Sequence, residues 1–205
     1  MQAVERPMPN ALSRTTLTLL LVVGLSATLP SSIMAQEKLA AGDEQPLKPE
    51  RNPPGDIPDN QVFIDFVSPL GFSLKVPEGW ARRDTPDGAS FADKYGRITV
   101  IQTTAPKMPT VDAAKQALVP DLEKSFHAVT VTAIKPVKLP AGPAVLVSYG
   151  SNSDPNPVTN KAIRLENDRY YFWKDGKLVA VNFSAPAGAD NADQWDMMAK
   201  SFRWR

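Results

Sequence analysis

Residues 62–76 read VFIDFVSPLGFSLKV, and this stretch predicts how the fold begins. Apolar side chains recur at every second position at Val62, Ile64 and Phe66. A period of two is typical of a strand that buries one face. The same period returns over residues 72–76, after a turn signal that contains proline and glycine. The stretch therefore predicts an antiparallel hairpin at the start of the folded domain.

Further along the chain, strand-like and helix-like patterns alternate in blocks. Residues 111–122 carry apolar side chains at helical spacing, with Thr110 placed as the N-cap. Pro120 should kink this helix or begin a second one, because its ring blocks a backbone hydrogen bond. Residues 195–202 predict a C-terminal amphipathic helix, capped by Asp190 or Asp193.

The other segments read as strands. They cover residues 89–92, 97–104, 127–139, 144–149, 161–166, 169–173 and 178–183. Asp175-Gly176 predicts a tight hairpin turn before the last of these strands, and Pro136 indicates an edge strand or a break. Blocks of strands separated by a helix predict an α+β protein, with a curved antiparallel sheet and helices on its faces.

The first 35 residues have the order of a secretory signal peptide. Arg6 and Arg14 precede an apolar run over residues 17–25, and small residues precede Ala35. We expect cleavage near Ala35 and a periplasmic or secreted protein. The alternative is an uncleaved membrane anchor, although the apolar run is shorter than the roughly 20 residues that a span needs. Membrane contact is expected only through this signal, before cleavage.

Residues 36–60 are rich in proline and poor in apolar side chains. Five of the 20 prolines of the chain lie here. Proline removes backbone donors and fixes φ, so the stretch should form neither a helix nor an inner strand. We interpret it as a disordered linker that contributes nothing to the core. The folded domain is then expected over residues 61–205.

Composition excludes several classes of function. The 205 residues include 23 basic and 22 acidic side chains, so the charge is nearly balanced. A nearly neutral chain lacks the basic excess of proteins that bind nucleic acid through its phosphates. Cysteine is absent, which excludes disulfides, thiol nucleophiles and zinc–thiolate sites.

No motif in the chain names a reaction, a metal or a cofactor. His127 is the single histidine, and the Gly-x-Ser-x-Gly motif of serine hydrolases is absent. Asn152, Asp154 and Asn156 alternate as the first ligands of a calcium loop do, but Ile163 stands where that loop needs a glutamate. We read these residues as turn formers, and His127 as a helix C-terminal residue. The sequence predicts no metal, no cofactor and no enzyme.

Residues 169–174, RYYFWK, have the most unusual composition of the chain. In a strand, Tyr170 and Phe172 point to one face of the sheet, and Tyr171 and Trp173 point to the other. In one interpretation all four aromatic side chains are core. In the other, one pair forms a contact surface flanked by Arg169 and Lys174, of the kind enriched at protein interfaces. These six residues are the candidate binding residues of the sequence.

Two further stretches resemble PsbP/Mog-like domains. Residues 72–80, FSLKVPEGW, resemble their opening, in which an apolar strand ends in a Pro-x-Gly-Trp turn. Residues 194–204, QWDMMAKSFRW, resemble their last helix and terminal Ser-Phe segment. The resemblance covers about residues 61–205 and implies an αβα sandwich whose members are mostly non-catalytic.

The leading hypothesis is an exported, non-catalytic binding or assembly-accessory domain that acts on a protein or another component of the cell envelope. A periplasmic carrier of a lipid or other apolar small molecule is the alternative. A hydrolase with an unrecognised site is the least favoured. A pocket between sheet and helix would distinguish the carrier from the protein-binding domain.

Overall fold

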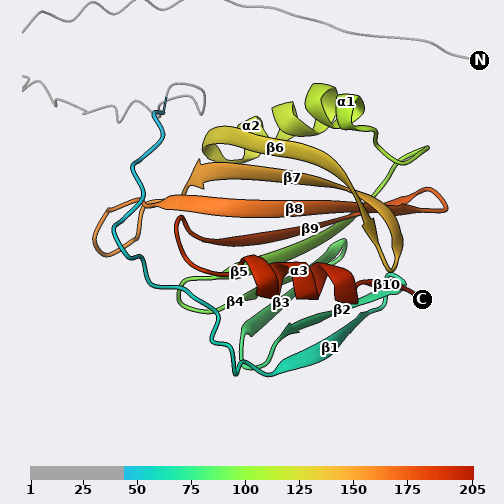
Figure 1. Cartoon of the computed structure of the whole chain (residues 1–205), viewed down its shortest axis with the longest axis horizontal. Helices are drawn as coiled ribbons and strands as arrows, with labels where there is room; N and C mark the ends of the chain where they lie inside the picture. Colours follow the sequence, from blue (N-terminus) through green and yellow to red (C-terminus); the bar gives the residue numbers. More distant parts are fainter. Residues whose placement is uncertain (1–43) are drawn as a thin grey trace, which may run out of the picture. The chain divides into compact units, whose positions relative to one another are not determined.

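The computed structural model describes residues 44–205, and the predicted signal peptide and its cleavage site lie outside this range. Its centre is a seven-stranded antiparallel sheet with the order β3-β4-β5-β9-β8-β7-β6 (Figure 1). The strands are β3 (Ala81–Thr85), β4 (Gly88–Ala92), β5 (Arg97–Thr104), β6 (His127–Leu139), β7 (Gly142–Asn152), β8 (Arg164–Lys174) and β9 (Lys177–Pro186). Strand β6 is an edge strand, as Pro136 indicated.

A second, three-stranded sheet contains the predicted hairpin. Strands β1 (Phe63–Ser68) and β2 (Phe72–Pro77) pair antiparallel, with Phe66 opposite Leu74. Gly71 closes the turn with a φ of 96°, which favours glycine. The last strand, β10 (Arg203–Trp204), adds to β2 from the C-terminus. This two-residue strand was not predicted.

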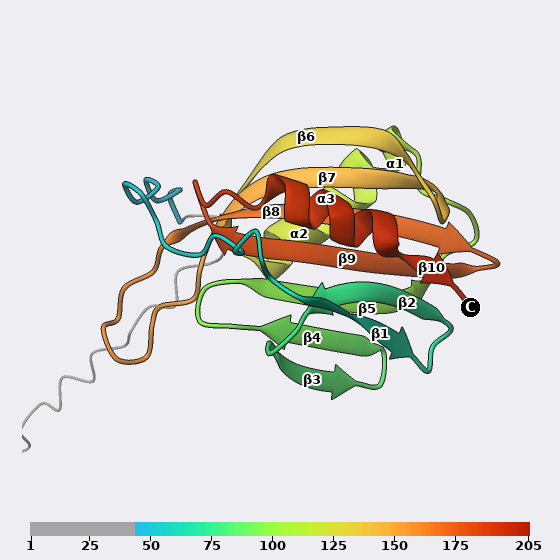
Figure 2. The same cartoon turned by 60° about the horizontal axis from the view of Figure 1, so that its bottom comes forward.

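Both faces of the large sheet are covered (Figure 2). One face carries the helical segment α1 (Val111–Ala113), η1 (Ala114–Leu118) and α2 (Val119–Ser125). The other face carries α3 (Ala192–Ser201) together with the small sheet. Each face has its own cluster of buried apolar side chains. The predicted curved sheet with helices on its faces is confirmed.

The helical segment follows its sequence signals. Thr110 caps α1, and its hydroxyl accepts a hydrogen bond from the Ala113 N–H at 3.1 Å. Pro120 lies in the first turn of α2, directly after the wider helical turn of η1. The sequence predicted either a kink at Pro120 or the start of a second helix, and a second α-helical piece, α2, does begin next to Pro120. The wider turn of η1 joins the two α-helical pieces.

Strand β8 differs from the prediction, which placed two strands around Asn167-Asp168. The structure has one continuous strand of 11 residues. Asn167 donates from Nδ2 to the Ser151 hydroxyl at 3.0 Å, and the Ser148 hydroxyl donates to Asp168 Oδ1. Both bonds join β8 to β7, so two residues that usually form turns are held in extended conformation by the neighbouring strand.

Two other local predictions also need correction. Strand β3 was not predicted, because all five of its side chains are exposed and show no apolar period. Neither Asp190 nor Asp193 caps α3; the N-cap position is Asn191, which makes no side-chain capping bond. Its amide instead accepts from the Ile57 N–H at 2.6 Å and donates to the Gly55 carbonyl at 3.0 Å.

The N-terminal segment, residues 44–60, packs against the domain. It contains no helix or strand, as its prolines indicated. However, Ile57 is only 6% exposed and belongs to the core cluster of the α3 face. The Leu47 N–H also donates to Asn152 Oδ1 at 3.0 Å. Residues 44–60 therefore contact the folded domain through Ile57 and Leu47, and their proline-rich composition did not indicate these contacts. No helix of the described residues is long and apolar enough to cross a membrane.

Candidate functional site

The predicted aromatic residues lie on β8 and divide between the two faces of the sheet. Tyr170 and Phe172 belong to the core of the α3 face, and Tyr171 belongs to the core of the opposite face. All three are 5% exposed or less. Trp173 is half-buried, and its indole N–H donates to the Ala105 carbonyl at 2.8 Å. Three of the four aromatic side chains are thus core residues, and the fourth, Trp173, packs partly buried against the core.

The two basic residues that flank this run do not form a common surface with it. The Arg169 guanidinium lies 5.5 Å from the centre of the Tyr171 ring, and its Nε is buried without a hydrogen-bond partner among the described residues. Lys174 is exposed at the end of β8, next to the hairpin turn. The structure therefore places three of the four aromatic side chains in the two cores and does not bring the six candidate residues together on one surface.

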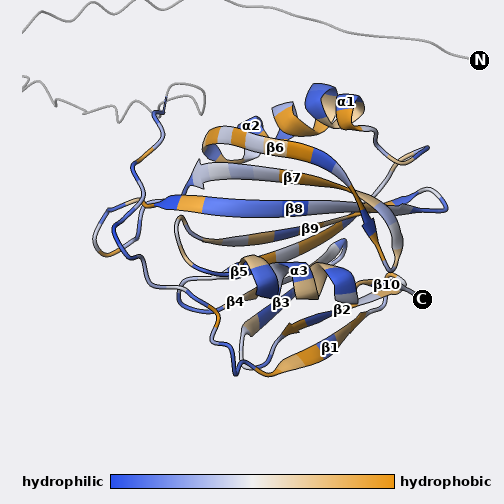
Figure 3. Ribbon diagram, in the orientation of Figure 1, coloured by the Kyte–Doolittle hydropathy of each residue, from blue (hydrophilic) through white to orange (hydrophobic). Residues whose placement is uncertain are grey.

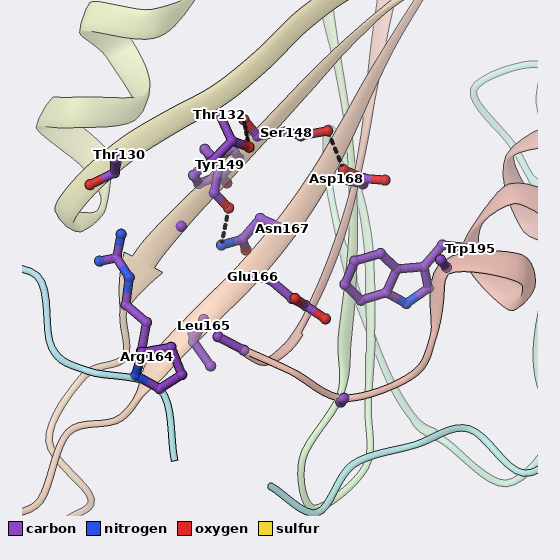
Figure 4. Close-up of a pocket in the computed structure, with 15 residues that line it drawn as sticks. Thr130, Thr132, Ser148, Tyr149, Arg164, Leu165, Glu166, Asn167, Asp168 and Trp195 are labelled. Carbon is purple, nitrogen blue, oxygen red and sulfur yellow. Dashed lines mark hydrogen bonds between the residues drawn. The ribbon is translucent and has the colours of Figure 1, made fainter. Parts of the chain in front are cut away.

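A different part of β8 lines a cavity of about 510 Å³ on the α3 side of the sheet (Figure 4). Arg164, Glu166 and Asp168 lie at every second position of β8 and so share this face. In Figure 4, Arg164 lies at one end, Trp195 at the other, and the two carboxylates lie between them. We call this cavity the groove.

Strands β6 and β7 supply hydroxyl groups to the groove. Thr130 and Thr132 come from β6, and Ser148 comes from β7. Thr132 donates to the Ser148 carbonyl at 3.1 Å, and the Ser148 hydroxyl donates to Asp168. Thr130 is exposed and forms no side-chain hydrogen bond with another described residue, which leaves its hydroxyl free for a ligand.

The two carboxylates of the groove are partly shielded from water. Burial raises the pKa of Glu166. A hydrogen bond from the Gly188 N–H to its Oε2, at 3.3 Å, acts in the opposite direction. Burial also raises the pKa of Asp168, against the effects of the Ser148 hydroxyl and the Lys135 charge. The middle of the groove therefore carries two carboxylates that form no ion pair with a described residue.

Arg164 is the cation of the groove. It is 8% exposed, and burial lowers its pKa. Its Nη1 donates to the Ala128 carbonyl at 2.8 Å and to Asn152 Oδ1 at 3.1 Å. Within residues 44–205 no carboxylate pairs with it. A guanidinium bound only by neutral acceptors keeps its charge available to an anion.

Apolar side chains form the remaining wall of the groove. Trp195 of α3 stacks on Phe183 of β9 with the ring centres 6.1 Å apart, which fixes the indole beside the groove. Ala189 precedes α3, and Ala192 is the first residue of this helix. Pro49 reaches the groove from the N-terminal segment. The site thus combines charged groups, hydroxyl groups and an apolar wall, as ligand pockets generally do.

His127 lies outside the groove. It is the first residue of β6, not the last of a helix as predicted. Its Nδ1 is 2.8 Å from Glu44 Oε2, and its Nε2 is 3.2 Å from Asp154 Oδ1. It therefore bridges the N-terminal segment and the loop after β7.

The predicted turn formers after β7 are only partly turn residues. Asn152 is buried in β7 and binds Leu47 and Arg164, whereas Asn156 accepts from the Val158 N–H in an exposed turn. No cluster of three metal-binding side chains occurs among the described residues.

Sequence reasoning missed the groove because it treated Asn167-Asp168 as a break. A charged residue at positions 164, 166 and 168 has a period of two. In one continuous strand this period places three charges on a single face. The signal was present, but reading it required β8 to be uninterrupted.

The sheet, its two helical layers and the small sheet define an αβα sandwich of the PsbP/Mog-like kind. No protein-family model matches the chain, and no curated protein matches it in sequence. Solved structures do match. The cyanobacterial PsbP of Synechocystis sp. PCC 6803 aligns with a TM-score of 0.53 at 15% identity, over 74% of this chain and 98% of its own. The Ran-binding protein Mog1p of Saccharomyces cerevisiae aligns with a TM-score of 0.50 at 13% identity, over 71% and 96%. The likeness confirms the predicted fold.

Proposed function

We propose that this protein is an exported, non-catalytic binding domain that holds a polar group of an envelope component in the groove. The observation that carries the proposal is the combination of about 510 Å³ of space with three charged side chains that form no ion pair with a described residue. Partly buried charges without partners weaken a fold, so their presence in an open cavity favours a ligand that completes them.

The groove favours a polar ligand over a lipid. A lipid chain laid over Glu166 and Asp168 would remove water from both carboxylates without replacing its hydrogen bonds, which is unfavourable. The apolar wall at Trp195 and the alanines suits only a small apolar part of a ligand. The proposed occupant therefore differs from that of an apolar carrier, although both use a pocket between the sheet and a helix.

Binding without catalysis accords with the fold and with the sequence. Mog1p is described as a Ran-binding protein, so the same fold serves binding in another chain. The only histidine lies outside the groove, and cysteine is absent. Export is proposed from the order of residues 1–35.

Site-specific photocrosslinking in intact cells tests the proposal. A crosslinking side chain at Thr132, in the groove, should capture an envelope component. The same side chain at Thr85, exposed on the far edge strand β3, serves as the matched control. Adducts from position 132 that disappear in Glu166→Gln would support the groove as the binding site. Adducts from position 85 alone, or none from either, would contradict it.

A further inference from the structure

The charges of the groove have opposite signs and do not neutralise each other. Arg164 forms no ion pair with Glu166, although both lie on the same face of β8, two residues apart. The guanidinium turns instead toward the Ala128 carbonyl of β6 and Asn152 of β7. The groove therefore keeps a positive group and a negative group separate, and both adjoin the same space.

Gly150 explains how the positive group is kept at the floor of the groove. A Cβ at this position would lie 2.5 Å from Nη2 of Arg164, closer than any real contact allows. The guanidinium therefore lies flat over the glycine, where a side chain would otherwise stand. The structure gives hydrogen bonds only from Nη1 of this arginine to other described residues. Nη2 thus remains a donor for an anion that enters the groove.

The negative group lies toward the other end. Glu166 and Asp168 lie on one face of β8, and the negative charge of Asp168 raises the pKa of Glu166 further, because like charges on one face of a strand repel. Asp190 adds to the negative field at Glu166, and Lys135 is the one basic residue that acts on Asp168. A ligand ammonium placed here would compensate two carboxylates that the described part of the protein leaves without an ion pair.

We propose that the groove binds a short peptide by its two charged ends, with the amino group at Glu166 and Asp168 and the carboxylate at Arg164. The proposal rests on the function proposed above and names the class of ligand. A neutral saccharide would leave both charges unpaired, and a simple anion or a simple cation would neutralise only one of them.

The spacing of the charges sets the length of the peptide. Arg164 and Asp168 are four residues apart on β8, which is about 13 Å along an extended strand. The guanidinium folds back over Gly150, which lies opposite Glu166 on β7, so the span to be bridged is shorter than this. In a single amino acid both charges are attached to one Cα, whereas a short peptide carries them at opposite ends of its backbone. A peptide of two or three residues spans about 7–11 Å when extended, and Thr130 can bond its backbone.

Calorimetric titration of the full-length chain with trialanine tests the proposal. The comparison uses three peptides: one with free ends, one acetylated at the amino end and one amidated at the carboxyl end. We expect the free peptide to bind, and each modification to weaken binding about tenfold or more, as the loss of a charge-assisted hydrogen bond does. Equal affinity of all three peptides, or no binding of the free peptide, would overturn the proposal.

Variants then assign each end of the peptide to its partner. In Glu166→Gln, acetylation of the amino end should cost much less affinity than in the natural chain, because the partner of the ammonium is already lost. The control is Glu123→Gln, an exposed carboxylate on α2 at the opposite face, in which acetylation should cost as much as in the natural chain. An unchanged effect of acetylation in Glu166→Gln would contradict the assignment.

The two proposals fail separately. Crosslinks from position 132 without any binding of trialanine would retain the groove as a site for an envelope component and reject the charged-end peptide. Loss of both results would reject the groove altogether. The peptide comparison does not require a variant that folds, because the change is made in the ligand.

Discussion

At the residue scale, the absence of a side chain at position 150 decides where Arg164 lies. Gly150→Ala would place a methyl group 2.5 Å from Nη2, so the guanidinium must leave the sheet. Its bonds to the Ala128 carbonyl and to Asn152 would be lost or weakened. We expect the free energy of unfolding to fall by about 1–3 kcal/mol, the range for a buried hydrogen-bonding group left without its partners. Urea denaturation monitored by circular dichroism measures this change.

A double-mutant cycle separates this effect from other effects of a methyl group. In the Arg164→Met background the guanidinium is already absent, so Gly150→Ala should cost clearly less than it does in the natural chain. An equal cost in both backgrounds would mean that the methyl group collides with the strand and not with Arg164.

Glu166 illustrates, also at the residue scale, how a binding group weakens its own fold. Burial raises the pKa of this carboxyl in the folded state above its unfolded value. Between the two pKa values the folded protein binds more protons than the unfolded chain, so stability falls as the pH rises through that window. Above the folded pKa the whole penalty is present, and acidification relieves it.

The variant Glu166→Gln removes this penalty. We expect it to raise the free energy of unfolding at neutral pH by about 0.5 kcal/mol, a magnitude suited to a partly exposed charge. The gain should shrink as the pH falls below the unfolded pKa, where both states of the natural carboxyl are protonated. Thermal melting from pH 3 to pH 8 measures both effects. A variant that is less stable than the natural chain at neutral pH would contradict the expectation.

At the scale of elements, the N-terminal segment behaves as part of the domain. Ile57 is 6% exposed in the core of the α3 face, and its N–H binds the amide of Asn191 at the start of α3. We expect Ile57→Ala to lower the free energy of unfolding by about 2–3 kcal/mol, the low end for buried aliphatic truncations, because the site lies at the margin of the core.

Leu47 provides the control within the same segment. Its side chain is 40% exposed, so Leu47→Ala should change the free energy of unfolding by no more than about 0.5 kcal/mol. If both variants were equally harmless, the segment would be dispensable for folding, as its composition first suggested.

Most elements of this fold could be predicted from local patterns. The period of two in residues 62–76 predicted the β1–β2 hairpin, and Asp175-Gly176 predicted the β8–β9 turn, in which both residues have positive φ. Thr110 and Pro120 marked the starts of the helical pieces α1 and α2. Each of these signals acts within a few residues, so no knowledge of the tertiary structure was needed.

The features that were missed all depend on distant contacts. Asn167-Asp168 is typical of a turn in the sequence, but hydrogen bonds with Ser148 and Ser151 of β7 hold both residues in a strand. The composition of residues 44–60 indicates disorder, whereas in the structure the Ile57 N–H binds Asn191, more than 130 positions away. The groove depends on both sets of contacts. An interrupted β8 would not place its three charged side chains on one face, and Pro49 of the N-terminal segment forms part of the wall. Sequence patterns alone therefore gave the fold class but not the site.

At the scale of the whole molecule, we predict that the exported protein lacks residues 1–35, which lie outside the described part of the chain. The order of arginines, apolar run and small residues in this stretch is that of a cleaved signal. Intact-mass analysis of protein recovered from the cell envelope should find a chain that starts near Gln36. A retained Met1 in the membrane fraction would identify an anchor instead.

Within residues 44–205, a stack of phenylalanines joins the large sheet to the small one. Phe202, which follows α3, lies 4.0 Å from Phe172 of the large sheet and 5.6 Å from Phe72 of the small sheet, measured between ring centres. All three rings are 1% exposed or less. We expect Phe202→Ala to lower the free energy of unfolding by about 3–5 kcal/mol, as for other large buried aromatics.

Hydrogen exchange locates this effect. Because Phe202 is the ring between the two sheets, amides of β1 and β2 should lose protection in Phe202→Ala more than amides of β8 and β9 do. Tyr95→Ala, at a side chain that is 39% exposed, is the control and should lower the free energy of unfolding by less than about 1 kcal/mol. Equal loss of protection in all four strands would mean that the sheets unfold as one unit, and that Phe202 stabilises the whole core without specifically holding the small sheet in place.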